Sequence, residues 1–80
     1  MFSVYVTLNS IEKVKNFVGD IVRFDADFDL VSGRYIVDAK SIMGIFSLDV
    51  SKPIELKIHA DEAEKEDILT ALQPYIVQGC

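Results

Sequence analysis

Three features of this 80-residue chain have residue types and spacings that could do chemistry. His59, the only histidine, could act as a general base or accept a phosphoryl group. Three aspartates alternate in the segment Asp25-x-Asp27-x-Asp29, as they do at the start of a calcium-binding loop. Ser41 directly precedes a short apolar segment, so its hydroxyl is placed to cap a helix. Each feature also has a plainer structural explanation.

His59 lacks the companions that a catalytic or metal site needs. No serine or cysteine nucleophile motif and no glycine-rich loop accompanies it, and the single cysteine is the terminal Cys80. One cysteine and one histidine cannot complete a zinc site. The acidic run from Glu62 to Asp67 is explained by a solvated first turn that matches the helix dipole. The sequence therefore predicts a protein that is not an enzyme and has no metal and no cofactor. His59 is expected to lie exposed at a strand end.

The three aspartates do not complete a calcium loop. An EF-hand loop that starts at Asp25 needs glycine at its sixth position and glutamate at its twelfth, where this chain has Leu30 and Ile36. The residues between the aspartates are apolar, which is the period-two pattern of a half-buried strand. Asp25, Asp27 and Asp29 are therefore expected to line the solvated face of a sheet.

The periodicity of the apolar residues supplies the elements around these features. It predicts strands at 2–8, 24–30, 34–39 and 54–58, and helices at 11–22, 41–47 and 61–73. A turn at Val31–Gly33 joins the second and third strands, with Gly33 free to take a positive φ. The order β-α-β-β-α-β-α predicts the α+β class, as an open-faced β-sandwich. One domain over residues 1–80 would hold a four-stranded antiparallel sheet with three helices on one face.

The charge composition excludes two classes of binding partner. The net charge is −5, from 13 acidic and 8 basic residues, and the bases are scattered. This balance argues against nucleic acid and against anionic lipid as partners. No apolar run approaches the roughly 20 residues that span a bilayer, and no basic leader precedes the first strand. We expect a cytoplasmic protein that is a monomer rather than an oligomer.

The segment from Lys40 to Leu48 is the most informative part of the sequence. Ser41 is a natural N-cap for a helix of about two turns, which cannot turn all of its large apolar residues inward. Those residues are Ile42, Met43, Ile45, Phe46 and Leu48. Met43 and Phe46 are expected to be at least partly exposed as a binding surface. The alternative is that the loop at 49–53 folds over them.

This segment resembles the regulatory-serine segment of HPr, the histidine-containing phosphocarrier protein of the bacterial sugar phosphotransferase system. Arg23–Asp27 and Gly33 also fall where that family has its second strand and hairpin glycine. The resemblance implies that Ser41 matches the serine that a dedicated kinase phosphorylates. It implies protein partners, namely phosphotransferase-system components, a serine kinase or a transcription regulator. The residues that would contact them are Lys40, Ile42, Met43 and Phe46.

The chain departs from this family at the carrier site. HPr carries its phosphoryl group on a histidine at the N-cap of the first helix, followed by an arginine and a proline. The segment Leu8–Val14 has none of these, and Ser10 lies near the matching position. A serine phosphate ester is too stable to pass on readily, and Glu12 would repel the incoming anion. The resemblance therefore implies a divergent member without the active-site histidine, which acts through the Ser41–Leu48 face.

Two alternatives stay open. The chain could still carry a phosphoryl group in the phosphotransferase system, on His59 or on another unexpected residue. It could instead be a small-molecule-binding regulatory module of the ferredoxin-like kind, which also begins β-α-β-β. That module needs a full-length helix between its third and fourth strands, where this sequence predicts a short one.

Overall fold

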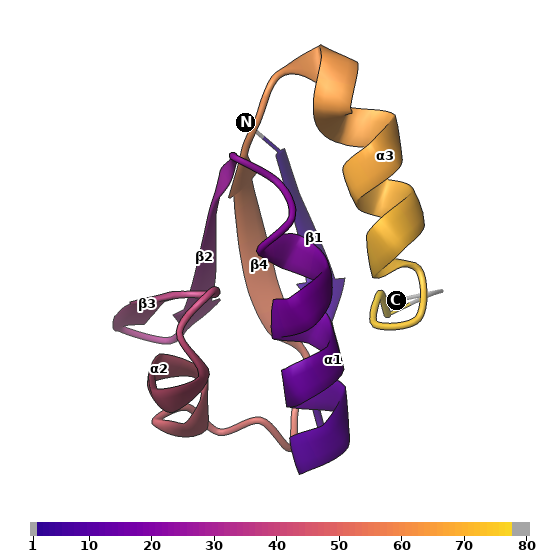
Figure 1. Ribbon diagram of the computed structural model, residues 1–80. Helices are drawn as coiled ribbons and strands as arrows, with labels where there is room; N and C mark the ends of the chain where they lie inside the picture. Colours follow the sequence, from indigo (N-terminus) through magenta and orange to yellow (C-terminus); the bar gives the residue numbers. More distant parts are fainter. Residues whose placement is uncertain (1, 78–80) are drawn as a thin grey trace.

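Seven elements follow one another in the order β-α-β-β-α-β-α (Figure 1). The computed structural model describes residues 2–77, and Cys80 lies outside this range. The elements are β1 (Phe2–Val6), α1 (Ile11–Ile21), β2 (Asp27–Ser32), β3 (Tyr35–Asp38), α2 (Ile42–Phe46), β4 (Ile54–His59) and α3 (Glu62–Leu72). The element order and the fold class predicted from the sequence are confirmed. The five-residue α2 is also too short for the ferredoxin-like alternative.

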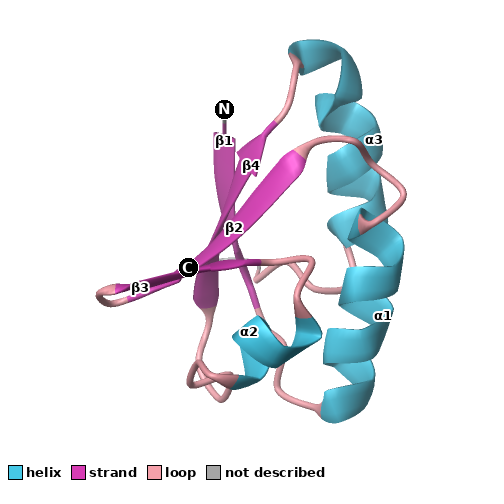
Figure 2. Ribbon diagram, turned by 60° about the vertical axis from the view of Figure 1, so that its left-hand side comes forward, coloured by secondary structure: helices cyan, strands magenta, loops and turns pink. Residues whose placement is uncertain are grey.

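One antiparallel sheet carries the fold, with the strand order β1-β4-β2-β3. The register places Val4, Leu56, Leu30 and Val37 in one row across the four strands. Because side chains alternate between the two faces of a strand, this row and its equivalents form one apolar face. All three helices cover that face, and the opposite face of the sheet is bare (Figure 2).

The first helix supplies much of the core. Ser10 is its N-cap, and the Ser10 hydroxyl accepts a hydrogen bond from the Lys13 backbone N–H at 3.1 Å. Its buried side chains follow the helical period, and they are Val14, Phe17, Val18 and Ile21. Ile11 and Val22 belong to the same apolar pattern but lie exposed at the two ends of the helix. The apolar pattern of the sequence therefore includes one residue at each end that does not reach the core.

Three details of the predicted elements are wrong. The turn predicted at Val31–Gly33 lies at residues 33–34, because Val31 and Ser32 belong to β2. The second strand begins at Asp27, so Asp25 lies in the preceding loop and not on the sheet face. Ala63, taken as an apolar position of the last helix, is exposed. It stands five residues before the buried Ile68, which is about 140° around the helix. Gly33 does take a positive φ, of 60°, at the first position of the β2–β3 turn.

The chain after α3 forms a contact that the local sequence pattern does not reveal. The Thr7 N–H bonds the Tyr75 carbonyl at 2.8 Å, and the Val77 N–H bonds the Tyr5 carbonyl at 2.9 Å. The Tyr75 ring meets the Phe17 ring edge-on, with centroids 5.5 Å apart. The C-terminal segment therefore covers the end of the outer edge of β1, at Tyr5–Thr7. Among residues 2–77, no helix is long and apolar enough to span a membrane.

The Tyr75 hydroxyl predicts a pH dependence of stability. It donates a hydrogen bond to Asp20 at 2.8 Å. Burial, that hydrogen bond and the Asp20 charge raise the pKa of Tyr75 from 10.0 to about 12. The folded protein therefore holds this proton more tightly than the unfolded chain does. The stabilisation is complete below pH 10 and is lost as the pH rises through about 12.

Ultraviolet titration and urea unfolding of wild type and Tyr75→Phe test this expectation. The variant should lack the absorbance step near pH 12, and its stability should fall less steeply at high pH. Other groups titrate in both proteins, so the difference between them isolates this phenol. Identical titration curves near pH 12 would show that Tyr75 does not hold its proton in this way.

Candidate functional site

The short helix α2 has a serine at its N-cap and another at its C-cap. Ser41 has extended dihedral angles (φ −101°, ψ 109°), and its hydroxyl accepts a hydrogen bond from the Gly44 N–H at 3.2 Å. Ser47 follows the helix, and its hydroxyl donates to the Gly44 carbonyl at 2.5 Å. A side chain that accepts from the N3 amide is the expected N-cap geometry. The capping role predicted for Ser41 is therefore confirmed, and Ser41 is an exposed residue.

The apolar residues of α2 divide between the core and the surface. Ile45 is fully buried, and Leu48, just beyond the helix, is 9% exposed. Met43 is 80% exposed, Phe46 41% and Ile42 37%. We call these three residues the α2 face. The exposure expected for Met43 and Phe46 is confirmed, and the loop at 49–53 leaves them accessible.

Gly44 allows α2 to lie against β3. A Cβ atom at this position would be 3.4 Å from the Val37 Cβ and 3.4 Å from the Ser41 hydroxyl oxygen. Both distances lie at the lower limit of ordinary van der Waals contact, so a side chain here would have little room between α2 and β3.

Lys40 anchors the segment that leads into α2. Its ammonium group donates to the Phe24 carbonyl at 2.8 Å and lies 5.6 Å from the centroid of the Phe28 ring. The side chain therefore joins the β3–α2 connection to the loop before β2. Lys40 lies next to the α2 face, but its ammonium group bonds the Phe24 carbonyl and does not point to a partner.

Ser10 occupies the N-cap of α1, the helix that packs beside α2. Its hydroxyl is exposed and already accepts the Lys13 N–H. Glu12 lies in the first turn. The site therefore presents a hydroxyl beside a carboxylate, and the chain's only histidine is on another element.

That histidine ends β4, in the exposed strand-end position expected for it. The His59 Nε2 lies 2.9 Å from Asp29 Oδ2, and Asp27 is its direct cross-strand neighbour. Asp27 and Asp29 lie on the bare face of the sheet, as expected from the sequence. Lys57, two residues before His59 on the same face of β4, lies opposite Asp29, so two carboxylates and one ammonium group surround the imidazole.

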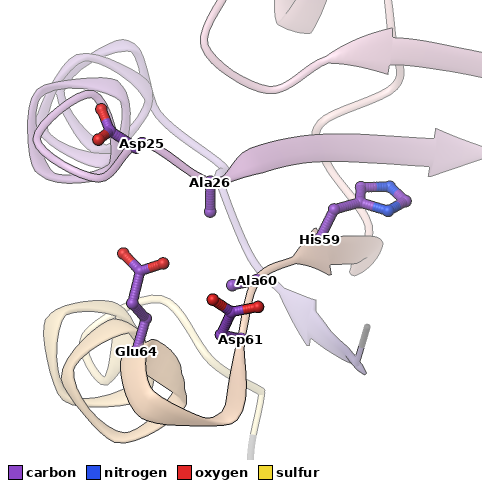
Figure 3. Close-up of a pocket in the computed structure, with 6 residues that line it drawn as sticks. All are labelled: Asp25, Ala26, His59, Ala60, Asp61 and Glu64. Carbon is purple, nitrogen blue, oxygen red and sulfur yellow. The ribbon is translucent and has the colours of Figure 1, made fainter.

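A surface pocket lies beside His59 at this end of the sheet (Figure 3). Its lining residues are Asp25, Ala26, His59, Ala60, Asp61 and Glu64. The imidazole points away from the Asp25 and Glu64 carboxylates (Figure 3). Three further carboxylates therefore surround this pocket, and they oppose the approach of a phosphate. Within residues 2–77, no three histidine, cysteine, aspartate or glutamate side chains are grouped to hold a metal ion.

Sequence reasoning identified Ser41, Met43 and Phe46 but missed the contacts that fix their surroundings. The partners of Lys40 and His59 lie 16 and 30 residues away in the chain. Periodicity reports only on residues that are close in sequence, so it carries no signal for these pairs.

Comparison with protein families and solved structures gives one consistent match. The family model PTS-HPr, described as the PTS HPr component phosphorylation site, matches residues 12–78. This match covers most of the chain, and it begins two residues after Ser10.

Three solved structures resemble this fold over nearly the whole chain. The crystal structure of HPr-C-His from Thermoanaerobacter tengcongensis is 27% identical and covers 92% of this chain and 89% of its own, with a TM-score of 0.75. The phosphocarrier protein HPr from Bacillus anthracis str. Ames is 30% identical, with coverages of 95% and 94% and a TM-score of 0.70. The histidine-containing phosphocarrier protein of Mycoplasma shares only the fold, at 15% identity, coverages of 98% and 98%, and a TM-score of 0.67.

Proposed function

The chain belongs to the HPr family of the bacterial phosphotransferase system, and from this premise we propose that it is a regulatory member that binds a protein partner through its α2 face. Proteins of this family work with other proteins of the system, so a protein partner is the general expectation. The proposal adds that this chain is neither an enzyme nor a histidine phosphocarrier.

The exposure of Met43 directly beside the Ser41 cap is the observation that carries this proposal. An 80% exposed methionine, followed by a partly exposed Phe46, forms an adaptable apolar surface next to a hydroxyl that can be modified. Burial of such an apolar surface against a partner lowers the free energy of the complex. Ile42 extends the surface, and Lys40 borders it with its ammonium group held internally.

Ser41 supplies a means of control in this proposal. A phosphate on its hydroxyl would add about two negative charges and three acceptor oxygens beside Met43. Those oxygens can still accept the Gly44 N–H that the hydroxyl now accepts, so the helix start would be kept. The proposed partners are phosphotransferase-system components, a serine kinase and a transcription regulator.

The proposal also assigns Ser10 to the position of the family's active-site histidine. Ser10 is the N-cap of the first helix, which is where the family carries that histidine. A serine hydroxyl is a weak phosphoryl acceptor, and its phosphate ester does not pass readily to a second protein. Glu12 in the first turn adds repulsion. The carrying step would therefore be lost while the fold is kept.

Incubation with enzyme I and phosphoenolpyruvate, followed by mass spectrometry, tests the loss of the carrier function. We expect no acid-labile phosphate on this protein, because its only histidine lies beside the carboxylates of Asp27 and Asp29. An HPr protein that contains the active-site histidine is the positive control. Acid-labile phosphate that disappears in His59→Gln would instead establish the chain as a carrier.

A further inference from the structure

The two outer edges of the sheet differ. The C-terminal half of the β1 edge, at Tyr5–Thr7, is covered by the C-terminal segment through the hydrogen bonds of Tyr75 and Val77. At the other edge lies β3, and no strand within residues 2–77 pairs with its outer side. The β2–β3 hairpin also projects away from α1 and α3 (Figure 2). An uncovered edge strand presents backbone groups that another strand can pair with.

The backbone groups of Ile36 point to this open edge. The Ala39 N–H bonds the Phe28 carbonyl at 2.9 Å, which makes 28 and 39 a hydrogen-bonded pair. Such pairs alternate along an antiparallel ladder with pairs that do not exchange hydrogen bonds. Val31 and Ile36 form a pair of the second kind, three residues further along each strand. The Ile36 N–H and C=O therefore face outward, and its side chain is 65% exposed.

The sequence of this edge is complementary to itself. When Arg34–Asp38 is laid antiparallel against a second copy with Ile36 at the two-fold axis, Arg34 faces Asp38 of the other copy, twice. Tyr35 then faces Val37, and Ile36 faces Ile36. We propose that β3 pairs in this register with β3 of a second copy of the chain, which joins the two sheets into one.

Charge favours a second copy as the occupant of this edge. Within one molecule, Asp38 lies directly opposite Asp29 on β2, and like charges in that position are destabilising. Asp29 is already bonded to His59 at 2.9 Å and faces Lys57 on β4. The incoming Arg34 would therefore supply a positive charge to Asp38. The strand Tyr35–Asp38 also contains no lysine or proline, the residues that commonly protect sheet edges.

The proposed pairing between the two copies is expected to be weak. The strand has four residues, and each copy carries a net charge of −5, which opposes association. In this proposal the protein is a monomer when dilute and a dimer when concentrated. This association uses β3 and does not depend on the partner binding proposed for α2.

Charge exchange tests the pairing by sedimentation across a range of protein concentrations. Arg34→Asp and Asp38→Arg should each weaken self-association by about tenfold or more, because each variant sets two like-charged pairs against each other. A mixture of the two variants restores both ion pairs, so it should associate at least as well as wild type. Arg23→Asp makes the same charge change as Arg34→Asp but lies away from β3. It should therefore weaken self-association only through the general repulsion of two extra negative charges per copy.

The register is tested separately by a disulfide. Paired residues in this geometry have Cα atoms about 5.5 Å apart, which a disulfide can span. Ile36→Cys in a Cys80→Ser background should therefore oxidise to a covalent dimer much faster than Tyr35→Cys in the same background. A wild type that stays monomeric when concentrated, a mixture that does not associate, or equal oxidation of the two variants would each overturn the proposal.

Discussion

Replacing Phe17 with alanine is expected to lower the free energy of unfolding by about 3–5 kcal/mol. The Phe17 side chain is fully buried at the centre of α1 and is among the largest in the core. Its removal leaves a cavity and also ends the edge-on contact with Tyr75. A small domain is stabilised by only about 5–15 kcal/mol in total, so this one change removes a large part of the stability.

Urea unfolding of wild type, Phe17→Ala and Ile11→Ala measures this effect. Ile11 is on the same helix but is 62% exposed, so its truncation should change stability by less than about 1 kcal/mol. A double-mutant cycle of Phe17→Ala with Tyr75→Ala should show a coupling of about 0.5–1.5 kcal/mol from the aromatic pair. A Phe17→Ala loss below about 1 kcal/mol would mean that this ring is not a core residue.

Much of this fold could be predicted from the sequence because the apolar pattern is regular where the chain is half-buried. Phe28 and Leu30 alternate with aspartates, and Val14, Phe17 and Ile21 follow the helical period, so strand and helix were assigned correctly. Periodicity is weaker at the ends of elements, where a side chain can follow the pattern without reaching the core. Asp25 was misplaced because the alternation continues two residues before the strand begins at Asp27. Ala63 was misplaced because its apolar type was counted although it lies about 140° around the helix from Ile68.

The candidate site was only partly accessible to sequence reasoning. Ser41 is a local feature, because its cap hydrogen bond joins residues three positions apart. The exposure of Met43 also followed from counting apolar residues in a short helix. The bond from Tyr75 to Asp20 joins residues 55 positions apart, and the contact of His59 with Asp29 depends on which strands are neighbours. Only the folded topology brings such residues together.

The double variant Met43→Lys/Phe46→Lys is expected to lose the protein partner while keeping the fold. Met43 is 80% exposed, so its replacement should change stability by about 0.5 kcal/mol or less. Phe46 is 41% exposed, so its replacement should cost about 1 kcal/mol, which leaves the protein folded. Binding should suffer far more, because two apolar contacts are lost and two charges would have to be desolvated. A loss of about a hundredfold in affinity follows if each residue contributes a little over 1 kcal/mol.

The measurement is recovery of partners from the cytosol of a Gram-positive bacterium on immobilised wild type and variants. Tyr5→Lys/Val22→Lys is the matched control, because it adds the same charges at exposed apolar residues outside α2.

Ser41→Asp belongs in the same experiment. Aspartate caps a helix about as well as serine, and its charge suits the helix start, so the fold should be unchanged. Binding should change, because the new charge lies beside the Met43 and Phe46 surface. It raises the cost of burying that surface against an apolar partner, and it attracts a partner that presents an arginine there. If wild type, the α2 double variant and Ser41→Asp all recover the same proteins in the same amounts, the α2 face is not the binding surface. Family membership would then reflect the ancestry of the fold alone.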